Sequence, residues 1–284
     1  MFRPPEAPPA AEADIDALCR LFEGREVCVL TGAGCSTESG IPDYRSPLQR
    51  ERVRRPIQHQ DFVRSERTRA RYWARSLLGW PSFARFEPNA CHRALSALAH
   101  AGHVRSVITQ NVDRLHQKAG SPRVLELHGA LERVVCLGCG ALLHRDVLQA
   151  QLRALNEGFA ERFAPELRPD GDAELPPSVE DTFVVPPCSA CGGVLKPDVV
   201  FFGDNVSPAL VEEAFEEVER ARALIVAGSS LHVFSGFRFV RRAHERGIPI
   251  AVVNLGETRA DALAHFRVEG RVSDVLGRVA ARLT

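Results

Sequence analysis

The chain lacks three features that would assign it to a common class of protein. Its 36 lysines and arginines are balanced by 36 aspartates and glutamates, so the formal net charge is zero. This balance gives no support for non-specific binding of nucleic acid, which needs a basic field. No apolar run approaches the roughly 20 residues that a membrane-spanning helix requires. We therefore expect neither nucleic acid nor a membrane among the direct partners.

A targeting signal is also lacking at the N-terminus. Residues 1–13 are rich in proline and alanine, without the apolar core of a signal peptide or the Arg- and Ser-rich character of a transit peptide. We expect this segment to be a disordered lead-in to a cytoplasmic protein. The chain has 284 residues, of which 45% are hydrophobic and 25% charged. These values are typical of a globular protein with one large domain and insertions, or with two domains.

The eight cysteines fall into two groups by their spacing. Isolated cysteines in apolar or tight contexts are expected to be small buried side chains. These are Cys19, Cys28, Cys35 and Cys91. The others form two Cys-x-x-Cys pairs, Cys136 with Cys139 and Cys188 with Cys191. Four thiolates can close a tetrahedral zinc site with no position left for chemistry, so this metal would hold the fold. Without a secretion signal, metal binding is favoured over disulfides or a redox pair.

Apolar runs bounded by small or polar residues predict the strands of a sheet. They lie at 27–30, 104–109, 124–127, 199–203, 224–227, 248–253 and 265–268. Helical patterns lie at 14–23, 61–78, 89–101, 146–156, 209–221, 235–246 and 273–283. The alternation predicts an α/β fold with a doubly wound, parallel, Rossmann-like sheet, into which a smaller zinc-binding module and a helical segment are inserted.

This pattern divides the chain after the lead-in into two predicted domains. The Rossmann-like, nucleotide-binding domain comprises 14–41, 86–130 and 199–284. The small domain comprises the helical segment 42–85 and the zinc-ribbon module 131–198.

A glycine-rich turn follows the first predicted strand. Gly32 and Gly34 allow a sharp turn and a close approach of the backbone to a ligand. Ser36 and Thr37 can then cap a helix whose N-terminus faces the same ligand, where exposed amides and the helix dipole favour an anion. The turn therefore predicts a phosphate cradle, the alternative being an ordinary glycine-rich turn.

The spacing within this turn differs from that of the dinucleotide fingerprint, because the third glycine, Gly40, comes late. An acid and a base, Asp43 and Arg45, follow directly. A hydride-transfer enzyme would continue its helix at this point, so an NAD-linked dehydrogenase is disfavoured.

Polar side chains follow two other predicted strands. Gln110, Asn111 and Asp113 come after 104–109, and His128 ends 124–127. Ligands bind at the carboxyl edge of open α/β sheets, where these side chains are expected. An unperturbed imidazole titrates near neutrality, which suits a general base worth about 10²–10⁴-fold in rate. His128 is the histidine that we assign this role, and His116, on the following helix, is predicted to be structural.

A second turn of small residues, Gly228-Ser229-Ser230, follows the strand 224–227. Asn254 ends the strand 248–253, where its amide can hydrogen-bond a ribose or an adenine. Together, the second turn and Asn254 indicate a nucleotide site.

Together these motifs resemble the sirtuin family in content and order. They are Gly-Ala-Gly-Cys-Ser from Gly32, Gly-Ile-Pro-Asp-Tyr-Arg-Ser from Gly40, Thr-Gln-Asn-Val-Asp-Arg-Leu-His from Thr109, Glu-Leu-His-Gly from Glu126, the paired cysteines, Gly-Ser-Ser-Leu from Gly228 and Asn-Leu-Gly from Asn254. The resemblance runs from about residue 14 to the C-terminus. The spans 55–65, 71–75 and 196–204 are similar to the class II branch. Asp204 departs from the glutamate that is commoner in the family, and Ser229 from the threonine of many members.

The resemblance implies removal of acyl groups from protein lysines, with NAD⁺ consumed as a co-substrate. His128, Asn111 and Asp113 would be catalytic, and Val199, Val200, Phe201 and Phe202 would pair with an extended substrate peptide. Phe62 would line an acyl channel. The implied NAD contacts are Gly32, Ala33, Gly34, Ser36, Thr37, Ile41, Asp43, Tyr44, Arg45, Gln110, Asn111, Asp113, Gly228, Ser229, Ser230, Asn254, Leu255, Gly256 and Val272.

Two other functions remain open at this point. Transfer of ADP-ribose to a protein would use the same pocket with a different acceptor. A non-enzymatic zinc-ribbon adaptor is the second, but it leaves the glycine turn and the strand-end polar residues unexplained.

Overall fold

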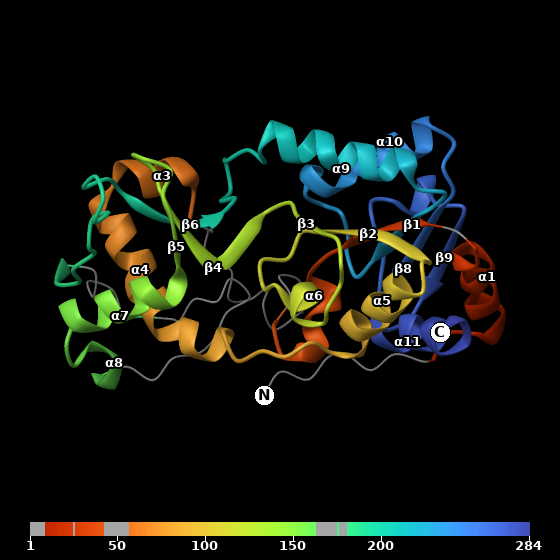
Figure 1. Ribbon diagram of the computed structural model, residues 1–284, viewed down its shortest axis with the longest axis horizontal. Coiled ribbons are helices and arrows are strands. Elements are labelled where there is room, and N and C mark those ends of the chain that lie inside the picture. Colours follow the sequence, from red (N-terminus) through yellow and green to blue (C-terminus); the bar gives the residue numbers. More distant parts are fainter. Residues whose placement is uncertain (1–8, 25, 43–56, 163–174, 176–180) are drawn as a thin grey trace. The chain divides into compact units, whose positions relative to one another are not determined.

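The computed structural model describes residues 9–24, 26–42, 57–162, 175 and 181–284. These residues form two compact units (Figure 1). The first unit contains the N-terminal segment up to residue 42, Glu87–Leu127 and Val206–Thr284. The second contains the segment that ends at Phe86, followed by His128–Asn205.

A six-stranded parallel sheet forms the centre of the first unit, in the order β3-β2-β1-β7-β8-β9. The strands are β1 (Val27–Thr31), β2 (Val104–Thr109), β3 (Val124–Glu126), β7 (Leu224–Ala227), β8 (Ile250–Asn254) and β9 (Phe266–Glu269). This is the strand order of the doubly wound dinucleotide-binding sheet, so the predicted fold class is confirmed. Every residue of β1, β7 and β8 is buried, as expected where helices cover both faces.

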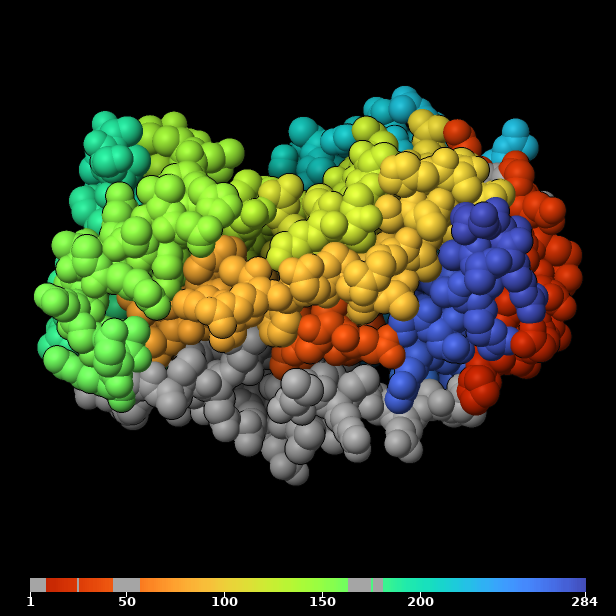
Figure 2. Space-filling model, turned by 60° about the horizontal axis from the view of Figure 1, so that its bottom comes forward, coloured from red at the N-terminus to blue at the C-terminus, as the bar shows by residue number. Residues whose placement is uncertain are grey.

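Helices cover both faces of this sheet. Figure 1 shows α9 (Pro208–Arg220) and α10 (Phe234–Glu245) on one side and α5 (Ala90–His100) and α11 (Val272–Leu283) on the other. With α1 (Glu12–Phe22), the latter two pack on the sheet in one apolar core. Figure 2 shows α11 lying between α5 and α1 on this face. Shorter elements are η1 (Ala33–Cys35), η2 (Thr37–Ser39), α6 (Leu115–Lys118) and η4 (Asp261–Leu263).

A capping box fixes the start of α5. The Asn89 side chain accepts a hydrogen bond from Cys91 N at 2.9 Å, and Asn89 N donates to His92 Nδ1 at 3.3 Å. The predicted cap at Asn89 is therefore confirmed.

The second unit is built on a three-stranded antiparallel sheet in the order β5-β4-β6. Its elements are α3 (His59–Arg64), α4 (Glu66–Phe83), β4 (Gly129–Cys136), β5 (Leu142–His144), α7 (Arg145–Leu155), α8 (Phe159–Arg162) and β6 (Leu195–Val199). The predicted helix 61–78 is thus two helices, because Ser65 caps α4 by accepting from Thr68 N at 3.1 Å. No helix among the described residues is long and apolar enough to cross a bilayer.

The prediction that residues 199–203 form a strand of the parallel sheet is wrong. The strand here is β6, which ends at Val199 and pairs with β4 in the second unit. The apolar run has another cause: the ring centroid of Phe201 lies 5.3 Å from that of Phe62 and 5.4 Å from that of Tyr72. Burial of an aromatic cluster and burial of a central strand produce the same short apolar pattern.

Candidate active site and metal centre

The turns that follow β1 and β7 pack backbone to backbone. Gly34 N donates to Gly228 O at 2.8 Å, and a Cβ added at Gly34 would lie 2.9 Å from Gly228 Cα. A Cβ added at Gly32 would lie 2.7 Å from the Cβ of Ser229. Gly228 itself has φ +62°, a conformation that favours glycine. The glycines are therefore required for the contact between the two turns, a role that the sequence did not reveal.

Ser36 and Thr37 were expected to cap a helix. The described residues that follow β1, up to residue 42, contain no such α-helix. The chain instead forms the two short 3₁₀ turns η1 and η2, and Ser36 makes no capping hydrogen bond. Thr37 Oγ1 donates back to Gly34 O at 3.1 Å. The helix prediction is wrong, because both hydroxyls are engaged within the turn or with the next strand end. Asp43, Tyr44 and Arg45 lie outside the described residues.

Ser36 joins the two polar residues that follow β2. Its hydroxyl donates to Asp113 Oδ2 at 2.6 Å and accepts from Asn111 Nδ2 at 3.0 Å. The Asn111 amide also donates to Gly32 O at 3.0 Å, and Leu115 N donates to Asp113 Oδ1 at 2.9 Å. Burial raises the pKa of Asp113, and the hydrogen bond from Ser36 opposes this shift. The network fixes both strand-end side chains in a single arrangement.

Two buried imidazoles lie behind this network. His116 Nε2 is 3.1 Å from Thr31 Oγ1, and His92 Nε2 is 3.5 Å from Ser36 Oγ. The two ring centroids are 4.7 Å apart. Burial lowers the pKa of His116 to about 4. Burial, with the neighbouring His116, lowers the pKa of His92 to about 2. Both rings are therefore neutral at physiological pH. Our sequence reasoning missed His92, although the Asn-x-x-His capping box could have indicated it.

The remaining predicted cofactor residues lie near the carboxyl ends of other strands of this sheet. Gln110 Nε2 donates to Ser229 Oγ at 2.8 Å, and a Cβ added at Gly236 would lie 2.7 Å from Gln110 Oε1. Asn254 Nδ2 donates to the carbonyls of Leu255 and Gly256 at 2.8 and 3.0 Å. Other members of the predicted set are largely buried, namely Ile41 and Val272. The sheet thus brings the turns after β1 and β7 and the ends of β2 and β8 to one edge.

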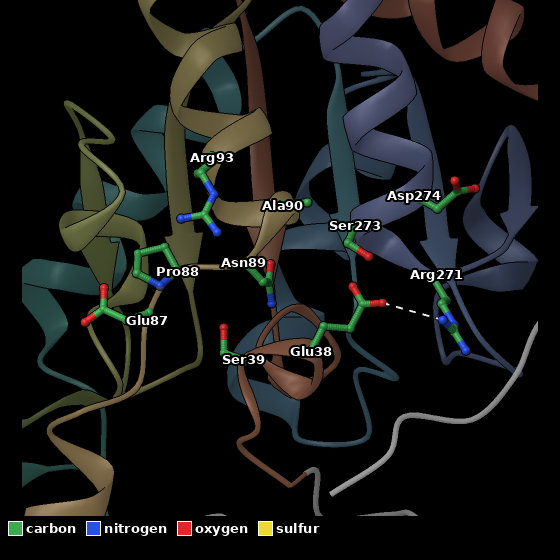
Figure 3. A pocket seen from close by; sticks show the side chains of 10 residues that line it. All are labelled: Glu38, Ser39, Glu87, Pro88, Asn89, Ala90, Arg93, Arg271, Ser273 and Asp274. Atoms are coloured by element: carbon green, nitrogen blue, oxygen red, sulfur yellow. Dashed lines mark ion pairs between the residues drawn. The ribbon is translucent and has the colours of Figure 1, made fainter. Parts of the chain in front are cut away.

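An open pocket of about 590 Å³ lies in the first unit (Figure 3). Glu38 faces Arg271 across it, with 3.8 Å between Oε1 and Nη1, and burial raises the pKa of Glu38. The other lining residues are Ser39, Glu87, Pro88, Asn89, Ala90, Arg93, Ser273 and Asp274. Among the described residues, no predicted cofactor residue lines this pocket, and its walls carry charges of both signs. We therefore do not assign the nucleotide to this pocket.

His128 belongs to the second unit, where its backbone is hydrogen-bonded to the residue that follows β6. The His128 carbonyl accepts from Val200 N at 2.9 Å. The next residue, Gly129, has φ +76°, and a Cβ there would lie 1.9 Å from Asp198 O, so no other residue fits without a backbone shift. The His128 side chain is half-buried. These contacts fix the backbone position of His128, the predicted base, directly before β4.

The predicted substrate residues continue from β6. Val199 pairs with Gly129, and Phe202 forms a parallel bridge with Gln58 and is 49% exposed. Phe201 packs in the aromatic cluster described above. Phe62, the expected channel wall, is fully buried in that cluster and offers no open surface.

The four paired cysteines converge at one end of the β4–β6 ladder. Their sulfur atoms all lie within 4.8 Å of one another, and none forms a disulfide. Cys136 Sγ is 3.5 Å from Cys191 Sγ, and Cys139 Sγ is 3.9 Å from Cys188 Sγ. Tetrahedral Zn–S bonds of about 2.3 Å place sulfurs roughly 3.8 Å apart, which fits these distances. A Cβ at Gly193 would lie 2.9 Å from Cys136 Sγ, so the turn is closed around the thiols. The cysteines form a site for one structural zinc ion.

Low pH is expected to destabilise the protein through His92 and His116. Both folded pKa values lie below the ordinary 6.5, so under acid conditions the unfolded chain binds protons that the folded chain does not. The free energy of unfolding should fall as the pH is lowered from 6.5 towards 4, by up to about 1.4 kcal/mol per pH unit for each ring. Urea unfolding at several pH values measures this slope. It should be shallower in His116→Gln and unchanged in His100→Gln, an exposed ring; equal slopes in all three proteins would contradict the assignment.

Zinc removal is expected to unfold the second unit. Cys188→Ala should lower zinc content and thermal stability together, because a structural zinc contributes on the order of 10–16 kcal/mol in small zinc modules. Metal analysis and thermal unfolding, with Cys19→Ala as a control far from the cluster in sequence, measure both. A Cys188→Ala protein that loses the metal but keeps its melting temperature would refute a structural role.

Comparison with known proteins connects this geometry to a family. A family model described as the Sir2 family matches residues 32–235. The Bos taurus protein named NAD-dependent protein lipoamidase sirtuin-4, mitochondrial, is 48% identical over 280 residues, which cover 97% of this chain and 88% of that protein. The Xanthomonas axonopodis pv. citri protein named NAD-dependent protein deacetylase is 52% identical over 248 residues, which cover 87% of this chain and 84% of that protein.

A solved structure described as Sir2-p53 peptide-NAD+ has a similar fold. The TM-score is 0.74 at 29% identity, and the match covers 94% of this chain and 98% of that one. The family match includes both glycine turns, the network after β2, His128 and the four cysteines. The predicted family and its class II branch are confirmed, and the chain belongs to the Sir2 family, the sirtuins.

Proposed function

We propose that this NAD-dependent protein deacylase binds nicotinamide at the Ser36–Asn111–Asp113 network and uses His128 as its general base. The network carries the proposal, because one hydroxyl holds an amide and a carboxylate in fixed positions at the ligand-binding edge of the sheet. Asn111 uses its amide nitrogen within the network. Its carbonyl oxygen is then the atom that would accept a hydrogen bond from the nicotinamide carboxamide.

The chemistry requires two bond exchanges at the nicotinamide ribose. The acyl-lysine amide oxygen attacks the anomeric carbon, and nicotinamide leaves with the electron pair of the glycosidic bond. His128 then takes the proton of a ribose hydroxyl, and the resulting oxygen attacks the imidate carbon. Water completes the release of free lysine and O-acyl-ADP-ribose. Protein groups contribute by aligning the reactants and excluding water until the last step.

We propose a cytoplasmic location for this activity. A four-thiolate zinc site needs a reducing compartment, and the cytoplasm is one. The mitochondrial matrix is the alternative, since mitochondria appear in the names of the sirtuin-4 relatives. Detection of the untagged protein in fractionated source cells decides between them, and recovery in the mitochondrial fraction would overturn the proposal.

Product analysis tests the proposed reaction. The purified protein is incubated with NAD⁺ and a panel of acyl-lysine peptides, and the products are identified by mass spectrometry. Deacylation yields O-acyl-ADP-ribose, nicotinamide and free lysine in equal amounts. ADP-ribose attached to the acceptor protein, without deacylated peptide, would instead identify the ADP-ribosyltransferase alternative.

Loss of the His128 ring is expected to abolish most deacylation and leave NAD⁺ binding largely intact. Positioned general bases contribute about 10²–10⁴-fold, so His128→Ala should lower kcat by that factor. The predicted phosphate and adenosine contacts belong to other motifs, so NAD⁺ affinity by calorimetry should change little. His144→Ala, an exposed ring in the same unit, is the control. Unchanged deacylation by His128→Ala would remove it from the mechanism, and loss of NAD⁺ binding alone would make it a ligand contact.

A further inference from the structure

We infer that Lys196 is a positioning residue that holds the substrate-binding segment and, through it, the backbone of His128. The chain contains only two lysines, Lys118 and Lys196, and all its other permanently basic side chains are arginines. Lys118 is exposed, whereas Lys196 is only 5% exposed. A buried ammonium requires partners, so its surroundings indicate what it holds. The inference rests on the proposed function.

Within the described part of the chain, the partners of the Lys196 ammonium lie in the segment that follows it. Nζ donates to the carbonyls of Pro197, at 3.3 Å, and Val199. It lies 4.7 Å from the centroid of the Phe201 ring and 3.6 Å from Asp204 Oδ2. Four residues between 197 and 204 therefore contact the single charged group of Lys196. A compact ammonium with three donors suits this enclosure better than the wide planar fork of an arginine, which explains a lysine in such an arginine-rich chain.

Asp204 extends this cluster to α3. Its Oδ2 lies 3.0 Å from His59 Nδ1, and His59 N donates to the Phe202 carbonyl at 2.9 Å. Burial lowers the pKa of Lys196, and the Asp204 carboxylate opposes that shift. The segment thus contacts both the Lys196 ammonium and His59, the first residue of α3. At this position the sequence also departs from the glutamate that is commoner in the family.

The same segment carries the backbone of the proposed base. Val200 N donates to the His128 carbonyl, and Val199 pairs with Gly129. Without the Lys196 ammonium, the carbonyls of Pro197 and Val199 lose a charged donor. Residues 199–202, which are proposed to pair with the acyl-peptide, would then no longer be held in one conformation. The predicted NAD⁺ contacts within the described residues lie in the first unit, so peptide affinity should suffer more than NAD⁺ affinity.

Peptide and NAD⁺ affinities of matched variants test this inference. Binding of an acetyl-lysine peptide is measured by fluorescence anisotropy, and NAD⁺ binding by calorimetry, with zinc content as a check on folding. We expect Lys196→Met to weaken peptide binding about tenfold and raise the peptide KM similarly, with NAD⁺ affinity within about twofold of wild type. Lys118→Met, the only other lysine substitution, should match the wild type in every measurement.

Asp204 provides a second, more exposed variant should Lys196→Met fail to fold. Asp204→Asn should weaken peptide binding in the same direction, and Asp204→Glu, which keeps the carboxylate, should restore it. Wild-type peptide affinity in both Lys196→Met and Asp204→Asn would overturn the inference, as would equal losses in Asp204→Asn and Asp204→Glu. A wild-type protein that binds peptide and NAD⁺ but forms no deacylated product would refute the proposed function instead. The binding measurements do not depend on turnover.

Discussion

The contact between the turns after β1 and β7 constrains the backbone at the carboxyl edge of the parallel sheet. The adjacent central strands bring Gly34 N within 2.8 Å of Gly228 O, which leaves no space for a side chain at Gly34 or at Gly228. The backbone after β1 continues in short 3₁₀ turns, and Ser36, which lies between them, contacts the residues that follow β2. The same turn after β1 thus makes both the contact with the β7 turn and the polar network with the residues after β2. Gly34, which the sequence suggested was needed for a close approach to a ligand, is needed for the contact with Gly228 in the turn after β7.

The buried side chains next to that network are the imidazoles of His92 and His116. Burial of a carboxylate or an ammonium at these positions would cost more free energy than burial of a neutral ring. A charged group with the burial of His92 or His116 would need a paired counter-charge. A neutral ring can instead both donate and accept a hydrogen bond, and so complete the bonding of Thr31 and Ser36 without adding charge. Asp113 is the acidic group of this network; burial raises its pKa, and the hydrogen bond from Ser36 opposes that shift.

The sequence predicted the sheet well because its signals are local and strong. Apolar runs such as Val27–Thr31 and Leu224–Ala227 are read directly as buried parallel strands, and Asn89 marks a helix start. The errors arise where one pattern has two physical causes. The run after Val199 is apolar because Phe201 enters an aromatic cluster. Ser36 resembles a helix cap, but its hydroxyl bonds side chains more than 70 residues away, which no local pattern encodes.

In the second unit, the zinc site and the Lys196 cluster act on opposite ends of one ladder. β4 and β6 pair Cys136 with Leu195 at the metal end and Gly129 with Val199 at the other, with an irregular register between them. A slip of one residue would turn every side chain of β6 to the opposite face. The four thiols gather at one end, and the Lys196 ammonium contacts the segment that leaves the other. Because the register is irregular between these ends, the backbone of His128 is held by contacts at its own end: the hydrogen bond from Val200 N and the close approach of Gly129 to the Asp198 carbonyl.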